Sequence, residues 1–294
     1  MQPIIFLNNQ FLPKENARIS PDDRGFYFAD GVYEVIRFYK GHPFYLEEHL
    51  NRLVNSLRAI RIDFEKIKDL PGIMKELINK NGLDENYAGV YLQITRGSHP
   101  RTHRFPTVPV IPTLYAYAFE KAPLIEQWKN GIKVITRPDI RWLKCNIKSI
   151  ALLPNTLLYQ EAVENGADEC VLVREGLVTE ASHSNVLGIR NGKLYTHPDG
   201  NLILPGITKK AVFDLCPDLN IQVIEEAMPE KSLVNMDELM IAGTGNEILP
   251  VVKINEILIG GGQPGPVTRK LQQAFFNITY RKLGNEKKCW LDAD

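Results

Sequence analysis

The order in which strand-like and helix-like segments follow one another limits the folds open to this chain. Residues 32–39 alternate in polarity as a half-buried strand does. Apolar side chains then recur at steps of three and four from Leu46 to Ile60, which predicts an amphipathic helix. Later, several short strand patterns succeed one another without helices between them. This irregular order favours a mixed α+β fold over a regularly alternating parallel one.

Other local patterns predict the same mixture of elements. Asn191 and Gly192 form a dipeptide that is typical of a two-residue hairpin turn. Residues 96–103 are rich in polar and turn-forming side chains, so we expect an exposed loop there. Further strands are expected over residues 90–95, 133–136, 170–173, 177–179, 186–189 and 193–196, and helices over 71–79, 154–165, 208–215 and 267–278.

The length of 294 residues suggests two domains, at about 150 residues per domain. The pattern of elements lapses over residues 121–129, which we interpret as a linker. The expected domains are a smaller N-terminal α/β domain over residues 1–120 and a larger C-terminal domain over 130–294.

Composition and charge exclude two broad classes of protein. Hydrophobic residues make up 44% of the chain and charged residues 24%, which is enough apolar material for packed cores and argues against disorder. Lysine and arginine number 35, as do aspartate and glutamate, so the net charge is zero. A chain without excess positive charge is a poor nucleic-acid binder, and we expect no nucleic-acid partner.

The cysteines and the N-terminal segment indicate a cytoplasmic protein. Four cysteines lie far apart without CxxC spacing, which suits neither a disulfide framework nor a zinc site. The first residues, MQPIIFLNNQFLPKEN, lack the charged and apolar regions of a signal peptide. No window approaches about 20 consecutive apolar residues, so we expect no membrane span. From the scattered cysteines we expect no metal site.

Four polar clusters carry candidate chemistry. Lys148 lies between Ile147 and Ile150, and a lysine in apolar surroundings can act as a neutral amine nucleophile. Alternatively, its amine simply reaches solvent along the surface. Glu180 follows an apolar strand, where its carboxylate can either hold a ring nitrogen protonated or face solvent in a turn.

The third and fourth clusters are two turns that suit phosphate. Residues 204–208 enter a helix whose first amides can bind an anion, although Thr208 can equally be an ordinary N-cap. Residues 243–247 are rich in glycine and can form an anion-binding nest or an ordinary turn. An amine, an acid and two phosphate-binding turns together are the parts needed to hold pyridoxal phosphate as a Schiff base.

Ordered motifs along nearly the whole chain strengthen this interpretation. They are DRGFYFADGVYEV, HLNR, DIRWLKCNIKS, VTEASHSNV, LYTHP, LILPGITKK and GTGNE. In this order they resemble the class IV (fold-type IV) pyridoxal-phosphate aminotransferases and, within that family, the D-amino acid aminotransferases. The resemblance implies a C-terminal domain with a barrel-like β core and a homodimer whose active site is shared across the interface.

The resemblance also implies roles for particular residues. Lys148 matches the lysine that forms the Schiff base and moves the substrate proton, and Glu180 matches the carboxylate at the pyridine nitrogen. Tyr33 matches a catalytic tyrosine near the substrate carboxylate and the Schiff base. The residues that match phosphate-binding positions are Arg52, Ile207, Thr208 and Thr244.

Arg101 and His103 match the RxH carboxylate trap of D-specific enzymes, which reaches in from the partner subunit. Because Cα–H must point at Lys148 on one ring face, the side that holds the carboxylate decides which enantiomer reacts. The alternative is a basic surface loop that these residues share with Arg96, His99 and Arg104.

Three positions depart from the family pattern. His183 stands where close relatives carry a small hydroxyl residue, so it is a possible substrate-pocket residue. Gly243 replaces a hydroxyl residue beside Thr244, and Lys209 replaces an arginine. None of the three changes removes a catalytic group.

The expected function is transamination of D-amino acids with a 2-oxo acid acceptor, in a ping-pong cycle that uses pyridoxal 5′-phosphate. Two enzymatic alternatives keep the cofactor: an L-branched-chain aminotransferase and an aminodeoxychorismate lyase. An alternative of another class is a non-catalytic binding protein with the same fold.

Overall fold

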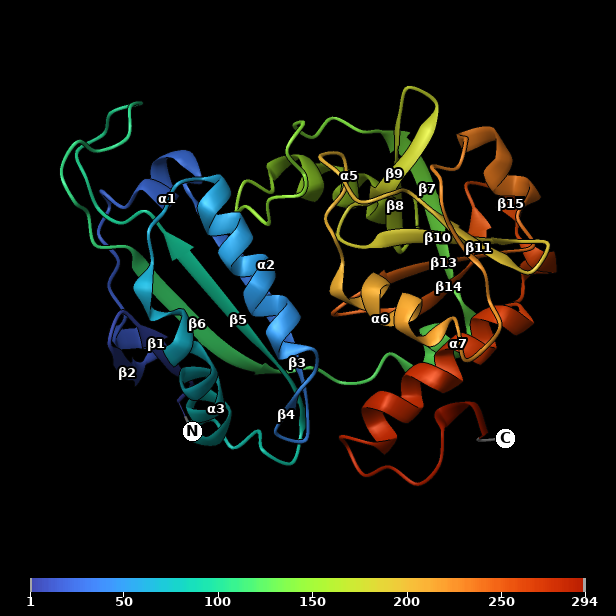
Figure 1. Cartoon of the computed structure of the whole chain (residues 1–294), viewed down its shortest axis with the longest axis horizontal. Helices are drawn as coiled ribbons and strands as arrows, with labels where there is room; N and C mark the ends of the chain where they lie inside the picture. Colours follow the sequence, from blue (N-terminus) through green and yellow to red (C-terminus); the bar gives the residue numbers. More distant parts are fainter. Residues whose placement is uncertain (1, 293–294) are drawn as a thin grey trace. The chain divides into compact units, whose positions relative to one another are not determined.

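A computed structural model describes residues 2–292, which form two compact units. The first unit comprises residues 2–122 and the segment Ile147–Leu152. The second comprises Pro123–Asn146 and residues 153–292. Each unit is built around its own β-sheet (Figure 1).

The first unit is a six-stranded antiparallel sheet with the order β2-β1-β6-β5-β3-β4. Its longest pairing joins β3 to β5, from Gly31 opposite Thr95 to Tyr39 opposite Tyr87. The strands are β1 (Ile4–Leu7), β2 (Gln10–Pro13), β3 (Gly31–Tyr39), β4 (His42–Pro43), β5 (Tyr87–Thr95) and β6 (Thr113–Glu120).

Helices α2 and α3 share one apolar core with this sheet (Figure 1). The leucine spacing of α2 buries Leu53 and Leu57, and each such burial contributes about 2 kcal/mol. The helices are α1 (Arg24–Phe28), α2 (Leu46–Ala59) and α3 (Leu70–Lys80), with short 3₁₀ turns η1 (Lys14–Asn16) and η2 (Glu65–Asp69). The expected strand over 32–39 and the expected helices over 46–60 and 71–79 are therefore confirmed.

The second unit contains a mixed sheet with the order β12-β11-β10-β13-β14-β7-β8-β9, and β15 pairs with β14. Three pairings are parallel: β11 with β12, β14 with β7, and β7 with β8. The strands are β7 (Ile132–Pro138), β8 (Glu169–Arg174), β9 (Leu177–Ala181), β10 (Asn185–Arg190), β11 (Lys193–Thr196), β12 (Val223–Glu225), β13 (Glu238–Gly243), β14 (Glu247–Ile254) and β15 (Ile257–Leu258).

This sheet curls into a barrel-like core, because β9 at one end of the order turns directly into β10. The turn is closed by the Ala181 amide, which donates to the Ser184 carbonyl at 2.7 Å. The expected hairpin between β10 and β11 is confirmed, since Asn191 and Gly192 have φ angles of 51° and 71°. Positive φ at both positions is what its two-residue turn requires.

Helices pack on the outside of the curled sheet. Leu158 and Ala162 of α5 are buried against β7 and β8. The helices are α4 (Ile125–Asn130), α5 (Leu153–Glu164), α6 (Ile207–Leu215) and α7 (Pro266–Phe276), with η3 (Glu230–Asn235), η4 (Gly260–Gly262), the π-helical η5 (Asn277–Arg281) and η6 (Trp290–Asp292). The two expected helices of residues 154–165 and 208–215 correspond to α5 and α6.

The expected linker over 121–129 overlaps α4, whose Trp128 is buried and donates its indole N–H to the Asn246 carbonyl at 2.9 Å. The division into domains at this position stays a prediction. Within residues 2–292, no helix is long and apolar enough to cross a membrane. Over the same range, no cluster of three or more metal-ligating side chains occurs.

Candidate active site

Lys148 lies in the segment Ile147–Leu152, which runs beside β3 in the first unit. The Tyr33 amide donates to the Lys148 carbonyl at 3.0 Å, and the Lys148 amide donates to the Ser56 hydroxyl at 3.2 Å. These backbone contacts orient the Lys148 side chain, and its Nζ lies 4.1 Å from the centre of the Tyr33 ring. The structure therefore brings Lys148 and Tyr33 together.

Tyr33 belongs to a row of aromatic rings across the sheet. Its ring stacks on Tyr91 with centroids 5.6 Å apart, and Tyr91 stacks on Tyr117 at 5.3 Å. Sequence reasoning missed Tyr91 and Tyr117. Their signal is weak in the sequence: β6 carries Tyr115 and Tyr117 two residues apart, and the pairing of Tyr117 with Tyr91 of β5 becomes visible only when the register of the strands is known.

Arg52 is buried in a cluster of charged groups in the first unit. Its Nε and Nη2 donate to the two oxygens of Glu34 at 2.7 and 2.8 Å. His49 contacts the same carboxylate through Nδ1 at 2.8 Å. Burial opposes ionisation of Glu34, but the Arg52 guanidinium outweighs it and holds the pKa of Glu34 well below its usual range. Burial lowers the pKa of His49.

Replacing Glu34 by glutamine is expected to lower the free energy of unfolding by about 3 kcal/mol at pH 7, because Arg52 loses its buried counter-charge. A carboxyl with a depressed pKa stabilises the fold above its ordinary value of 4.5 and loses this contribution as pH falls below it. Denaturant unfolding should therefore show a full difference at pH 7 that shrinks below pH 4.5. Glu85→Gln, an exposed control, should change stability at neither pH, and an undiminished difference in acid would contradict this account.

A hydrogen bond links the loop with Arg101 and His103 to Arg24 of α1. The Arg24 guanidinium donates to the Thr102 carbonyl at 2.7 Å, and Arg101 and His103 lie on either side of that carbonyl in the chain. Both side chains contact the Phe28 ring, with the Arg101 guanidinium carbon at 5.2 Å and the His103 ring at 5.4 Å.

The structure keeps Arg101 and His103 exposed, as expected for this loop, but the expectation was wrong for Arg96. Arg96 is buried because it donates to both oxygens of Asp30, at 2.7 and 2.9 Å, and to the carbonyls of Ile60 and Arg61. Arg96 is therefore not part of a basic surface shared with Arg101 and His103.

Glu180 is buried at the end of β9 in the second unit. The Arg141 guanidinium donates to Oε1, the Asn185 amide donates to Oε2 at 3.0 Å, and the Leu204 backbone amide donates to Oε2 at 3.1 Å. The solvent-facing alternative is thus wrong for Glu180. Burial raises the pKa of Glu180 to about 7, although Arg141 opposes this shift.

Arg141 is a residue that sequence reasoning missed. Its guanidinium also pairs with Asp139, through Nε at 2.9 Å and Nη2 at 2.9 Å. Asp139 in turn accepts the Thr179 hydroxyl at 2.9 Å. Both residues stand in the motif DIRWLKCNIKS, but only the fold shows that they hold the carboxylate of Glu180.

The two candidate phosphate-binding turns both lie against the same short segment of the second unit, Ser184–Asn185. A Cβ added to Gly206, which precedes Ile207 and Thr208, would meet the Asn185 side-chain oxygen at 1.8 Å. A Cβ added to Gly243, which precedes Thr244, would meet the Ser184 hydroxyl at 2.9 Å. Ser184 and Asn185 thus separate the two turns, and the Ser184 hydroxyl lies where a side chain at position 243 would begin.

The residues of the second unit fit a phosphorylated pyridine. Gly206 precedes α6, and no side chain caps the first amides of this helix, so these donors are available to an anion. Lys209 does not serve this site, because its Nζ pairs with Asp199 at 2.5 Å. A buried carboxyl at Glu180 suits a ring nitrogen that carries a proton.

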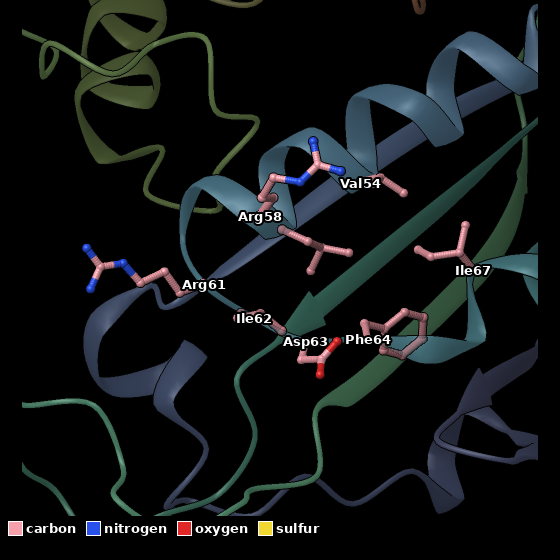
Figure 2. A pocket seen from close by; sticks show the side chains of 8 residues that line it. Val54, Arg58, Arg61, Ile62, Asp63, Phe64 and Ile67 are labelled. Atoms are coloured by element: carbon pink, nitrogen blue, oxygen red, sulfur yellow. The ribbon is translucent and has the colours of Figure 1, made fainter.

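Two surface cavities of the first unit lie elsewhere. One has a volume of about 410 Å³ and lies at the C-terminal end of α2; Figure 2 shows Val54 and Arg58 on this helix and Phe64 and Ile67 beyond it. The other, of about 520 Å³, is lined by residues that include Phe105 and Ile111. None of the candidate site residues lines either cavity.

Known proteins are similar to this chain in sequence. The family model described as amino-transferase class IV matches residues 31–254. A D-alanine aminotransferase of Staphylococcus haemolyticus is 40% identical over 272 residues, covering 92% of this chain and 96% of that protein.

Solved structures are also similar over the whole chain. The branched-chain amino acid aminotransferase of Escherichia coli has a TM-score of 0.88 at 27% identity, covering 99% of this chain and 98% of that one. The branched-chain amino acid aminotransferase of Thermobaculum terrenum, solved in its PLP form, has a TM-score of 0.83 at 25% identity, covering 97% of each chain.

Proposed function

The chain belongs to the class IV aminotransferase family, and on this premise we propose that it transfers amino groups from D-amino acids to 2-oxo acids with pyridoxal 5′-phosphate. Two groups carry the proposal. The amine of Lys148 lies against the ring of Tyr33, and the carboxyl of Glu180 is buried. The 40% identity to a D-alanine aminotransferase supports the substrate class.

Named residues would hold the cofactor. Arg52, Ile207, Thr208 and Thr244 would bind its phosphate, and Glu180 would keep a proton on its pyridine nitrogen. When bound, the cofactor supplies a ring that accepts the electron pair left at Cα when the substrate loses its proton. The Lys148 amine would take that proton and return it at the other carbon, because one flexible side chain reaches both positions.

Arg101, His103 and Tyr33 would bind the substrate carboxylate. An arginine and a histidine on one side of the site fix the carboxylate by charge-assisted hydrogen bonds, which leaves the amino-acid side chain on the other side. Arg24 would act as a positioning residue for this loop, since it holds the Thr102 carbonyl. In the proposed homodimer, the loop serves the site of the other subunit.

The proposal includes a cytoplasmic location. All four cysteines are buried thiols, and thiols of this kind persist in a reducing compartment. The proposed substrates are small amino acids and 2-oxo acids, and the proposed protein partner is a second subunit of the same chain.

One observation favours a second function, transamination of L-branched-chain amino acids. The Escherichia coli branched-chain enzyme matches this fold with a TM-score of 0.88, although its identity of 27% is below the 40% of the D-alanine relative. The presence of Arg101 and His103 together on Phe28 supports the D-specific function instead.

Replacing Arg101 by alanine tests the carboxylate trap. We expect KM for a D-amino acid to rise about 30-fold, because a charge-assisted hydrogen bond of about 2 kcal/mol is lost. The affinity for pyridoxal 5′-phosphate should stay unchanged, as measured by absorbance titration. Arg104→Ala, in the same exposed loop, is the matched control. Equal losses in substrate and cofactor affinity would indicate a structural role for Arg101 and contradict the trap.

A further inference from the structure

The loop that follows β5 carries the proposed carboxylate trap, and α1 with the turn before it holds the backbone of this loop (Figure 1). The Arg24 amide donates to the Gly97 carbonyl at 3.0 Å, and the His99 amide donates to the Asp22 carbonyl at 3.1 Å. The Arg24 guanidinium donates to the Thr102 carbonyl at 2.7 Å. These three contacts set the course of the loop along α1.

Helix α1 is itself fixed on the end of β5. The Asp23 carboxylate caps the helix by accepting the Gly25 amide at 2.8 Å, and its other oxygen accepts the Thr95 hydroxyl at 2.9 Å. A Cβ added to Gly25 would meet the Thr95 side chain at 2.4 Å, so the helix and the strand are in direct contact. The Arg24 side chain is buried and pairs with Asp30 at 2.8 Å. A side chain of α1 therefore has a well-defined position in the first unit.

Backbone contacts alone do not orient the two side chains of the trap. Arg101 and His103 are both exposed. A long arginine side chain has many rotamers in solvent, and ordering it costs conformational entropy. If both residues are to bind one carboxylate, a third group has to hold their side chains in a common orientation.

The ring of Phe28 contacts both side chains. The Arg101 guanidinium carbon lies 5.2 Å from the ring centre, within the distance of about 6 Å at which an aromatic face attracts a cation. The His103 ring centre lies 5.4 Å away, with an angle of 55° between the two planes. The guanidinium carbon of Arg24 also lies 4.7 Å from the Phe28 ring centre. One ring thus contacts the arginine that holds the loop backbone and both residues of the trap.

We propose that Phe28 is a positioning residue for substrate binding, whose ring orients Arg101 and His103 so that both donate to one carboxylate of a D-amino acid. This inference rests on the proposed function, because it assumes that these two residues bind the substrate carboxylate. An aromatic ring suits this task. Its face attracts the guanidinium, but it carries no oxygen that would compete with the substrate for the N–H donors.

Replacing Phe28 by leucine keeps an apolar side chain and removes the aromatic face. We expect KM for D-alanine to rise about fivefold, as the loss of a cation–π contact at an exposed arginine predicts. The value of kcat should stay unchanged, because Lys148 and Glu180 are not altered. Phe28→Tyr keeps the ring and should retain the KM of the wild type. Steady-state kinetics at a saturating concentration of the 2-oxo acid measures both constants.

The split between KM and kcat distinguishes positioning from a structural role. A fraction of unfolded protein lowers kcat and leaves KM unchanged, so a rise in KM reports the orientation of the trap. Phe26→Leu is the matched control, because it replaces a ring of the same helix that is 79% exposed. Both constants of this control should equal those of the wild type.

Combining two substitutions tests the contact between Phe28 and Arg101 directly. In the Arg101→Ala background, Phe28→Leu should raise KM by a smaller factor than in the wild-type background, because the cation that the ring orients is already absent. The same fivefold rise in both backgrounds would show that the ring acts independently of Arg101, and this result would overturn the inference.

The remaining outcomes separate this inference from the proposed function. An unchanged KM in Phe28→Leu, together with a raised KM in Arg101→Ala, would overturn the role of Phe28 and leave the carboxylate trap intact. A Phe28→Leu protein that loses kcat and keeps KM would show a structural role for the ring and also overturn the inference. A wild-type protein that is inactive with D-amino acids would overturn both proposals.

Discussion

Replacement of Lys148 by alanine is expected to abolish the visible absorbance change that accompanies binding of pyridoxal 5′-phosphate, and to lower turnover at least about 1,000-fold. The amine has two proposed tasks, attachment of the cofactor and movement of the Cα proton, and alanine can perform neither. The contacts of its backbone with Tyr33 and Ser56 do not involve the side chain, so the fold should survive. Absorbance spectra and steady-state rates measure the two effects.

Lys144→Ala provides the matched control for this variant. Lys144 is an exposed lysine of the same motif, and its loss should leave both the spectrum and the rate unchanged. A Lys148→Ala protein that keeps the absorbance of the wild type would show that another amine binds the cofactor.

Replacement of Glu180 by glutamine is expected to lower kcat about 100-fold while the protein still binds pyridoxal 5′-phosphate. An amide cannot hold a proton on the pyridine nitrogen, so the ring accepts electrons less well. Glutamine can keep the hydrogen bonds from Asn185 and Leu204, which limits the structural cost. Steady-state kinetics at saturating D-amino acid measures kcat.

Glu175→Gln, in the exposed turn between β8 and β9, is the control for the loss of a carboxylate. Its kcat should equal that of the wild type. A Glu180→Gln protein with unaltered kcat would contradict the electronic role of Glu180, and one that no longer binds the cofactor would indicate a structural role instead.

Local sequence patterns predicted the elements whose periodicity or turn residues are visible within a single segment. The leucine spacing of α2, the alternation of β3 and the Asn191–Gly192 turn each report one element or one hairpin. Long-range pairing is different. The return of Ile147–Leu152 to β3 depends on contacts between residues far apart in the chain, and no local period encodes them.

The residues of the candidate site divide in the same way, into those that local sequence predicts and those that only the fold reveals. Lys148 and Glu180 were identified from motifs and from the chemistry of an amine and a carboxyl. The groups that hold them, such as Ser56 behind Lys148 and Arg141 beside Glu180, were not identified, since their partners come from other elements. The pairing of Glu169 with His183 joins β8 to the turn after β9, and only the fold places the two together.

The most direct test of the central claim is an assay of the purified protein with pyridoxal 5′-phosphate and a 2-oxo acid acceptor, offered the D- and L-forms of alanine, glutamate and leucine in parallel. The account predicts formation of the new amino acid from D-substrates only. Turnover of L-leucine without turnover of any D-amino acid would contradict it, because the carboxylate would then bind on the side opposite to Arg101 and His103.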